Sequence, residues 1–529
     1  MIGYPPTSAF AICEFVATSM SIRGWIIDGG QSVSPTAESA IRGCASTCVR
    51  DRAYGVVAGS LIASRSQFAH AAYKTSHFEI LELVFLQSVI RNKFVLDRIA
   101  LSGEPSKQAL GKDAPIGATQ FAKSFFDGTV SPEPGQAGLL RWARLMALQN
   151  LRVGYLFSST GSYELVARSM LNGALLAAEE INASGLGIHL EPSVLNPGGD
   201  LSQYSALAAT LLKGQVRHVV GCYTSSSRKE VIPLFEKHDA LLWYPSHYEG
   251  FESSTNVIYT GAAPNQHVLP LVEYLIQHHG HRAFCVGSNY IWAWENNRIL
   301  RESVTARGGS VLAERYFAVG ETDFDQAIEA IIAARPSFVF LTLIGTSAYQ
   351  FFRDFRVACR ARGIDQAREI PVASCSLSEP ELEAIGEGAV DGHLSSSVYF
   401  CSIQSPANLR FLDAYQARFP KGPTASADAE ASYNAVWLLA LAAAAARTDD
   451  PRAIKAEVVH QYLDAPQGRV WIDEQTFHAY LTPRIGRSNR QAKFDLIGEA
   501  RAPVQPDPYL VHNSSRFEAA AVPSLRLVS

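Results

Sequence analysis

The sequence predicts an α/β protein with two doubly wound parallel-sheet lobes. From residue 151 onward, apolar runs of four to seven residues alternate with segments whose apolar residues recur at helical spacing. The apolar runs are continuous rather than alternating, which is typical of strands buried on both faces of a parallel sheet. The β–α units are too many for one modest sheet, so two lobes account for them most economically.

The individual elements follow in order along the chain. We expect strands at residues 151–157, 216–221, 240–243, 257–259, 283–287, 310–316, 338–342, 370–373 and 392–396. We expect helices at residues 164–182, 228–238, 267–279, 294–307, 323–334 and 346–361. A helix-rich stretch at 407–463 then interrupts the alternation, and residues 468–497 resemble a hairpin with strands at 468–472 and 478–482.

Composition excludes several classes of protein. Hydrophobic residues make up 47% and charged residues 18% of the 529 residues, so a large folded core is expected. The net charge of −4 gives no basis for direct nucleic-acid binding. The eight cysteines lack metal-ligand spacing and are scattered as in a reduced protein. No apolar run is long enough to span a membrane, and the N-terminus does not resemble a signal peptide. A cytoplasmic location is expected, with a periplasmic one as the alternative.

Residues 1–150 show no alternation of strands and helices, so no fold is predicted for them. We expect them to be an N-terminal extension that is non-native or partly disordered. Met146 stands five residues before the first expected strand. We expect Met146 to be the functional start, with the residues before it upstream sequence or a dispensable extension.

Polar and aromatic side chains gather where three expected strands end. The first such run is Gly221-Cys-Tyr-Thr-Ser-Ser-Ser-Arg-Lys229, the second Trp243-Tyr-Pro-Ser-His-Tyr-Glu-Gly250, and the third Gly287-Ser-Asn-Tyr-Ile-Trp-Ala-Trp294. Ligands of open parallel sheets bind outside the carboxyl ends of the strands. Hydroxyls, phenols and flat apolar walls together suit a neutral amide, which needs an acceptor, a donor and apolar cover. The simpler alternative is that the serines only cap helices and the aromatic rings only pack.

Several motifs carry no chemistry. Ser226 and Lys229 match Ser-x-x-Lys, but the companion motifs of penicillin-recognising enzymes are missing. His278, His279 and His281 flank Gly280, as at the end of a helix, rather than at a metal site. Glu249 and Glu252 are expected to be loop acids. No catalytic residue, metal site or cofactor is predicted.

A set of short runs occurs along the chain: Leu156-Phe-Ser-Ser-Thr-Gly161, Asn196-Pro-Gly-Gly-Asp200, Gly221-Cys-Tyr followed by Ser227-Arg-Lys229, Tyr248-Glu-Gly-Phe251, Gly261-Ala-Ala-Pro-Asn-Gln266, Tyr399-Phe400, Asp464-Ala-Pro-Gln-Gly468 and Pro506-Asp-Pro-Tyr-Leu-Val-His-Asn513. On these runs, the chain resembles the type I periplasmic-binding-protein superfamily over nearly all of residues 151–513. Within it, the amide sensors of amidase operons are the most similar, followed by urea and short-chain-amide receptors of ABC transporters.

The resemblance implies a hinge with three crossings and a ligand cleft between the lobes. It assigns residues 151–264 and 398–464 to lobe 1, residues 265–397 and 465–513 to lobe 2, and leaves 514–529 as a tail. The ligand contacts that it implies are Tyr223, Ser225, Tyr244, Ser246, Tyr290, Trp292, Thr342 and Thr346. Ser246, His247 and Trp292 depart from the pattern of acetamide sensors, and Thr224 is closer to the urea receptors.

The resemblance also implies a binding role rather than an enzymatic one. We expect a regulator of amidase expression that binds a short amide or urea-like compound and thereby releases an RNA-binding antiterminator protein. The alternative is the substrate-binding component of an ABC transporter, for urea, short amides or branched-chain amino acids, with a membrane permease as its partner. A homo-oligomer is compatible with either role.

Overall fold

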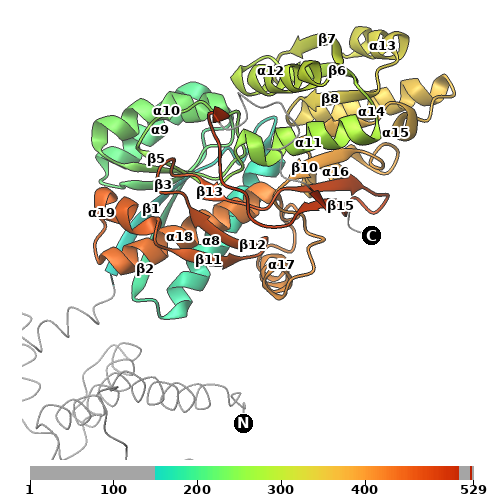
Figure 1. Ribbon diagram of the computed structural model, residues 1–529. Helices are drawn as coiled ribbons and strands as arrows, with labels where there is room; N and C mark the ends of the chain where they lie inside the picture. The colour runs from blue at the N-terminus through green and yellow to red at the C-terminus, as the bar shows by residue number, and fades with distance from the viewer. Residues whose placement is uncertain (1–148, 512–524, 527–529) are drawn as a thin grey trace, which may run out of the picture. The chain divides into compact units, whose positions relative to one another are not determined.

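The computed structural model describes residues 149–511 and 525–526. The expected extension up to residue 148, the start at Met146 and most of the expected tail lie outside the described residues. The described chain forms two large sheets flanked by helices, which make up two lobes, and a third, smaller sheet (Figure 1). The predicted α/β class with two doubly wound lobes is confirmed.

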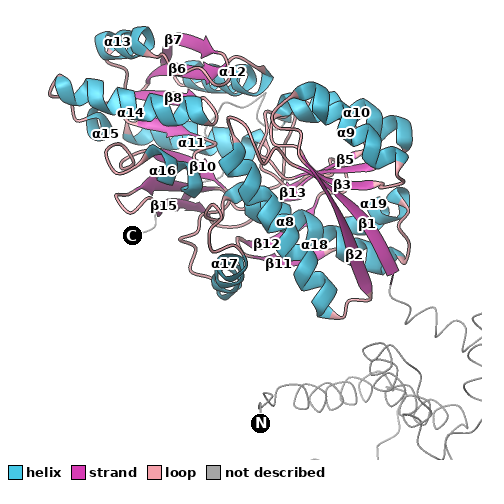
Figure 2. Ribbon diagram, turned by 180° about the vertical axis from the view of Figure 1, so that it is seen from behind, coloured by secondary structure: helices cyan, strands magenta, loops and turns pink. Residues whose placement is uncertain are grey.

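The first sheet is parallel throughout, in the order β2-β1-β3-β4-β5. Its strands are β1 (Gln149–Leu156), β2 (Ile188–Leu195), β3 (His218–Gly221), β4 (Leu241–Tyr244) and β5 (Val257–Tyr259). One face packs against α9 (Leu201–Lys213) and α10 (Ser225–His238). The other face packs against α8 (Glu164–Ser184), α18 (Ala427–Ala446) and α19 (Pro451–Val458) (Figure 2).

The second sheet is mixed, in the order β16-β15-β14-β10-β9-β8-β6-β7. Its parallel strands are β6 (Arg282–Ser288), β7 (Ser310–Phe317), β8 (Phe338–Thr342), β9 (Val372–Ser374) and β10 (Leu394–Ser397). The antiparallel strands β14 (Arg484–Ser488), β15 (Phe494–Ala500) and β16 (Leu525–Arg526) extend it beyond β10.

Helices cover both faces of this second sheet as well. The helices on one face are α11 (Pro264–His278) and α12 (Ile291–Ala306). Those on the other face are α13 (Asp325–Ala334), α14 (Thr346–Ala361), α15 (Gln366–Glu369) and α16 (Glu379–Ile385). Helix α17 (Pro406–Arg418) packs against α8 and α18 in a smaller apolar cluster.

A third, antiparallel sheet joins the first lobe. It consists of β11 (Tyr462–Ala465), β12 (Gly468–Ile472) and β13 (Ala479–Tyr480). Val470, Ile472 and Ala479 are buried in the core of the first lobe, and His478 forms a parallel bridge to Tyr259 at the end of β5. The expected lobe boundary at residue 465 therefore differs from the packing, since the chain leaves the first lobe only after this sheet.

Helix α18 is the apolar centre of the first lobe. By length and composition it could cross a membrane, but 67% of its most apolar window is buried inside the fold, as in the core helix of a globular domain. It crosses α8 so closely that a Cβ on Gly173 would lie 2.1 Å from the carbonyl oxygen of Ala429. The long apolar stretch is therefore accounted for by contact with α8.

Candidate functional site

The end of β3 directs two of the expected ligand contacts out of the first sheet. Cys222 follows the strand with a φ of 65°, a left-handed conformation that turns the chain sharply. Thr224 then caps α10, because its side-chain oxygen accepts a hydrogen bond from the backbone N–H of Ser227. This turn places Tyr223 and Ser225 at the carboxyl end of the sheet, where ligands of such sheets bind.

Five of the eight expected contacts meet in one pocket between the lobes. The empty space at this pocket is about 180 Å³, open solvent included. It is lined by Tyr223, Ser225, Ser246, His247, Tyr290, Trp292 and Ile344. Four of these residues belong to the first lobe, and Tyr290, Trp292 and Ile344 belong to the second. Trp292 packs edge-on against the ring of His247, with ring centroids 5.5 Å apart. The pocket is therefore a joint product of both lobes.

Tyr244, Thr342 and Thr346 do not line this pocket. Tyr244 is fully buried, and its hydroxyl donates to the backbone carbonyl of Tyr223 at 2.8 Å. The hydroxyl of Thr342 lies 3.2 Å from Oδ1 of Asn297 within the second lobe. These two side chains therefore make contacts within their own lobes and do not face the pocket.

Thr346 instead marks a contact between the lobes. Its backbone N–H donates to the carbonyl oxygen of Ser162 in the first lobe at 3.0 Å. The preceding Gly345 has a φ of 61°, and a Cβ there would lie 2.2 Å from the same oxygen. The lobes thus touch backbone to backbone at the N-terminus of α14, and glycine makes this approach sterically accessible.

A buried ion pair stands behind Ser225. The guanidinium Nη2 of Arg228 lies 2.7 Å from Oε1 of Glu249, and the two side chains are 0% and 2% exposed. The Arg228 carbon Cζ also lies 4.8 Å and 4.6 Å from the ring centroids of Tyr244 and Tyr248. Glu249 lies in a loop, as expected, but it is buried there as the counter-ion of an arginine on α10.

This ion pair fixes the hydroxyl of Ser225. The hydroxyl donates to Oε2 of Glu249, and Nη1 of Arg228 donates back to the Ser225 oxygen at 3.3 Å. A hydroxyl has one proton to donate and two lone pairs to accept with. Ser225 therefore retains only an accepting lone pair for a molecule in the pocket.

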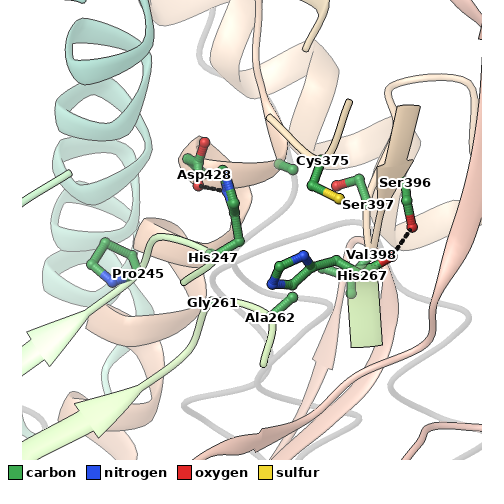
Figure 3. A pocket seen from close by; sticks show the side chains of 12 residues that line it. Pro245, His247, Gly261, Ala262, His267, Cys375, Ser396, Ser397, Val398 and Asp428 are labelled. Carbon is green, nitrogen blue, oxygen red and sulfur yellow. Dashed lines mark hydrogen bonds and ion pairs between the residues drawn. The ribbon is translucent and has the colours of Figure 1, made fainter. Parts of the chain in front are cut away.

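A second pocket, drawn in Figure 3, shares His247 with the first. The empty space at this pocket is about 270 Å³, open solvent included, and the pocket is lined mainly by Pro245, His247, His267, Cys375, Ser396, Ser397 and Asp428. Nδ1 of His247 lies 3.3 Å from a carboxylate oxygen of Asp428. Residues of both lobes line it, so it lies on the same boundary as the first pocket.

His267 contributes an acceptor to this second pocket. Its Nε2 lies 3.0 Å from the backbone carbonyl of Tyr248, so Nε2 carries the proton. Burial, with a smaller contribution from His247, lowers the pKa of His267 to about 3, so the ring is neutral. Its Nδ1 is then a buried acceptor without a partner among the described residues.

The surroundings of both pockets are unfavourable for an anion. Burial raises the pKa of Tyr223 well above its usual value, and the carboxyls of Glu381 and Asp428 raise it further. Burial also raises the pKa of Glu381 to about 8. The N-terminus of α10 favours an anion by about 0.3–1 kcal/mol, up to about 2 when partly buried. Burying a carboxylate without a cation costs several kcal/mol, and no Lys or Arg is among the described residues that line either pocket.

Neither a metal-binding cluster nor a disulfide is found in the described part of the chain. No group of three or more His, Cys, Asp or Glu residues between 149 and 511 is placed to hold a metal ion. The cysteines described there, Cys222, Cys285, Cys359, Cys375 and Cys401, are all free.

Comparison with known proteins covers nearly all of the described chain. A family model for a periplasmic binding protein domain matches residues 151–515. The fold is similar to that of a solute-binding protein of an ABC transporter from Rhodopseudomonas palustris HaA2, in complex with p-hydroxybenzoic acid. That likeness has a TM-score of 0.62 and 21% identity, and covers 70% of this chain and 100% of the other.

Two further proteins show how far the likeness extends. The branched-chain amino acid transporter substrate-binding protein from Streptococcus pneumoniae, in complex with isoleucine, has a TM-score of 0.58 and 20% identity, with 66% of this chain and 98% of the other covered. A limonene hydroxylase from Geobacillus stearothermophilus is 24% identical over 128 residues, which is 24% of this chain and 23% of that protein. That short segment says nothing of an enzymatic activity here.

Proposed function

Because the chain belongs to the periplasmic binding protein domain family, we propose that it is a solute-binding protein whose two lobes close over a small polar molecule. The observation that carries the proposal is the pocket lined by Tyr223 and Ser225 from one lobe and by Tyr290 and Trp292 from the other. A solute that contacts both walls only when the lobes meet shifts the equilibrium toward the closed form.

The polar groups of this pocket favour a short amide or urea-like solute. Ser225 offers an acceptor for an N–H group. Trp292 is 3% exposed, and its indole N–H has no acceptor among the described residues, so it supplies a donor for a carbonyl oxygen. The aromatic rings of Tyr223 and Tyr290 cover the apolar part of the solute. An amide is the simplest group that satisfies both a donor and an acceptor.

The receptor role in transport, the alternative raised by the sequence, has better support than the regulator role. The similar structures include solute-binding proteins of ABC transporters, with an aromatic acid and an amino acid as their ligands. The proposed partner is therefore a membrane permease rather than an antiterminator protein. The role is binding without catalysis.

Thermal-shift screening of the full chain tests this proposal. The panel is formamide, acetamide, butyramide, urea, 4-hydroxybenzamide, 4-hydroxybenzoate and isoleucine. A solute at a hundredfold excess over its Kd stabilises the folded state by about 2.7 kcal/mol, which raises the Tm. We expect at least one amide or urea to raise it. A panel without any shift would contradict solute binding, and a shift with isoleucine alone would contradict the ligand class.

A further inference from the structure

The hydrogen-bonding capacity of Ser225 is almost fully committed within the protein. Its proton is donated to Glu249, and one of its lone pairs accepts from Arg228 at 3.3 Å. Ser225 is 1% exposed and lines the first pocket, so its remaining lone pair is all that it can present there. A solute that meets Ser225 must therefore bring an N–H or O–H group.

The positive charge of Arg228 is also committed. Its guanidinium is 0% exposed and pairs with Glu249 at 2.7 Å, so the pair is neutral as seen from the pocket. No Lys or Arg is present among the described residues that line either pocket. The second pocket adds two further acceptors, Nδ1 of His267 and the carboxylate of Asp428.

From this geometry we infer that Glu249, held by Arg228, is a specificity-determining residue. Glu249 orients the Ser225 hydroxyl so that it can only accept a hydrogen bond from a solute. The pocket therefore selects N–H-bearing solutes over carboxylates. The inference rests on the proposed function and deepens it, since it names the group that the pocket recognises. Glu249 acts through Ser225 and is a positioning residue. The preference for N–H-bearing solutes would distinguish this chain from the similar solute-binding protein whose structure contains p-hydroxybenzoic acid.

Paired solutes that differ only in the group at Ser225 test the inference. Isothermal titration calorimetry on the full chain compares acetamide with acetate, and benzamide with benzoate. We expect the amide of at least one pair to bind about tenfold more tightly than its acid, the scale of one well-made hydrogen bond to a buried group.

Substitution of Glu249 then shows whether this residue sets the preference. Glu249→Gln keeps the size of the side chain but leaves the charge of Arg228 uncompensated beside Ser225, so the ratio of amide to acid affinity should fall about tenfold or more. A purely structural role of Glu249 would weaken both solutes alike and leave that ratio unchanged. Glu252→Gln is the matched control, because Glu252 pairs with Lys229 of the same helix at 3.0 Å but at the surface.

Ser225→Ala keeps the inference testable if Glu249→Gln does not fold. Removing the hydroxyl should weaken the amide and leave the acid unchanged, which again lowers the ratio. Tighter binding of the acid by the unaltered protein, or an unchanged ratio in a folded Glu249→Gln variant, would overturn the inference while leaving solute binding intact. Where Glu249→Gln does not fold, an unchanged ratio in Ser225→Ala would overturn it. Absence of binding by every solute would overturn the proposed function, and the inference with it.

Discussion

The two walls of the interlobe pocket are built on different principles. The first-lobe wall consists of Tyr223, Ser225, Ser246 and His247, and behind Ser225 lies a closed set of hydrogen bonds around the buried Arg228–Glu249 ion pair. The second-lobe wall, Tyr290, Trp292 and Ile344, is aromatic and apolar, and the indole N–H of Trp292 has no acceptor among the described residues. Under the proposed function, this difference means that the first lobe is preorganised to orient a solute, whereas the solute completes the hydrogen bonding of the second lobe.

The largest effect is expected from breaking the ion pair of the first-lobe wall. Glu249→Ala leaves the charge of Arg228 buried without a counter-ion, which should lower the free energy of unfolding by about 3–5 kcal/mol. Chemical denaturation of the full chain measures it. Glu252→Ala, which removes a partly exposed pair to Lys229, should cost at most about 1 kcal/mol. Equal losses in the two variants would mean that the first-lobe wall is not preorganised by its ion pair.

The contact between the lobes should be the next most sensitive feature. Gly345→Ala places a Cβ 2.2 Å from the Ser162 oxygen across the boundary. Because this clash arises only when the lobes meet, solute affinity should fall about tenfold or more. Gly363→Ala is a matched control, since Gly363 has a similar φ of +67° but nothing within 4 Å of its added Cβ. Equal affinities in the two variants would contradict binding by closure.

Removing the Ser225 hydroxyl should have a smaller effect. Ser225→Ala deletes one hydrogen bond to the solute, so amide affinity should fall by about 1 kcal/mol or slightly more. Tyr290→Phe provides the comparison on the second-lobe wall, where the ring remains as cover. We expect the larger loss at Ser225 in calorimetric titration, and the reverse order would show that the second lobe orients the solute.

The smallest effect on binding is expected at Thr342. Its hydroxyl is engaged by Asn297 inside the second lobe at 3.2 Å. Thr342→Val should therefore lower stability by about 1 kcal/mol and change solute affinity by less than about twofold. Denaturation and titration of the same sample measure both quantities. A loss of affinity as large as that of Ser225→Ala would show that Thr342 takes part in solute binding.

The sequence predicted those elements of the fold that show a pattern within a single short stretch of residues. Continuous apolar strands such as β3 and β8 are buried along their whole length, and this is visible as apolar runs. Strand β2 escaped detection because it lies at the edge of the sheet, and its C-terminal half alternates exposed and half-buried residues. Helix α9 was missed with it. The packing of β12 and β13 on the first lobe depends on contacts between distant segments, which no local pattern reveals.

The residues of the candidate site were predictable where they directly follow a strand, and not where they depend on contacts between distant segments. Tyr223, Ser225, Ser246, Tyr290 and Trp292 follow strand ends, so topology predicts that they lie at the carboxyl edges of the two sheets. The pairing of Arg228 with Glu249 spans 21 residues and joins a helix to a loop, so spacing could not show it. The available signal was the arginine's place one turn after Ser225 on α10, together with tyrosines at 244 and 248. Tyr244 does not line the pocket, because its side chain turns inward, under Tyr223.

Hydrogen–deuterium exchange on the full chain tests the central claim most directly. The chain is compared with and without the solute that gives the largest thermal shift, at a concentration that saturates binding. The account predicts slower exchange in both walls at once, at residues 222–228 after β3 and at residues 290–293 at the start of α12, because closure buries both. Protection confined to one lobe, or protection far from both segments, would contradict it.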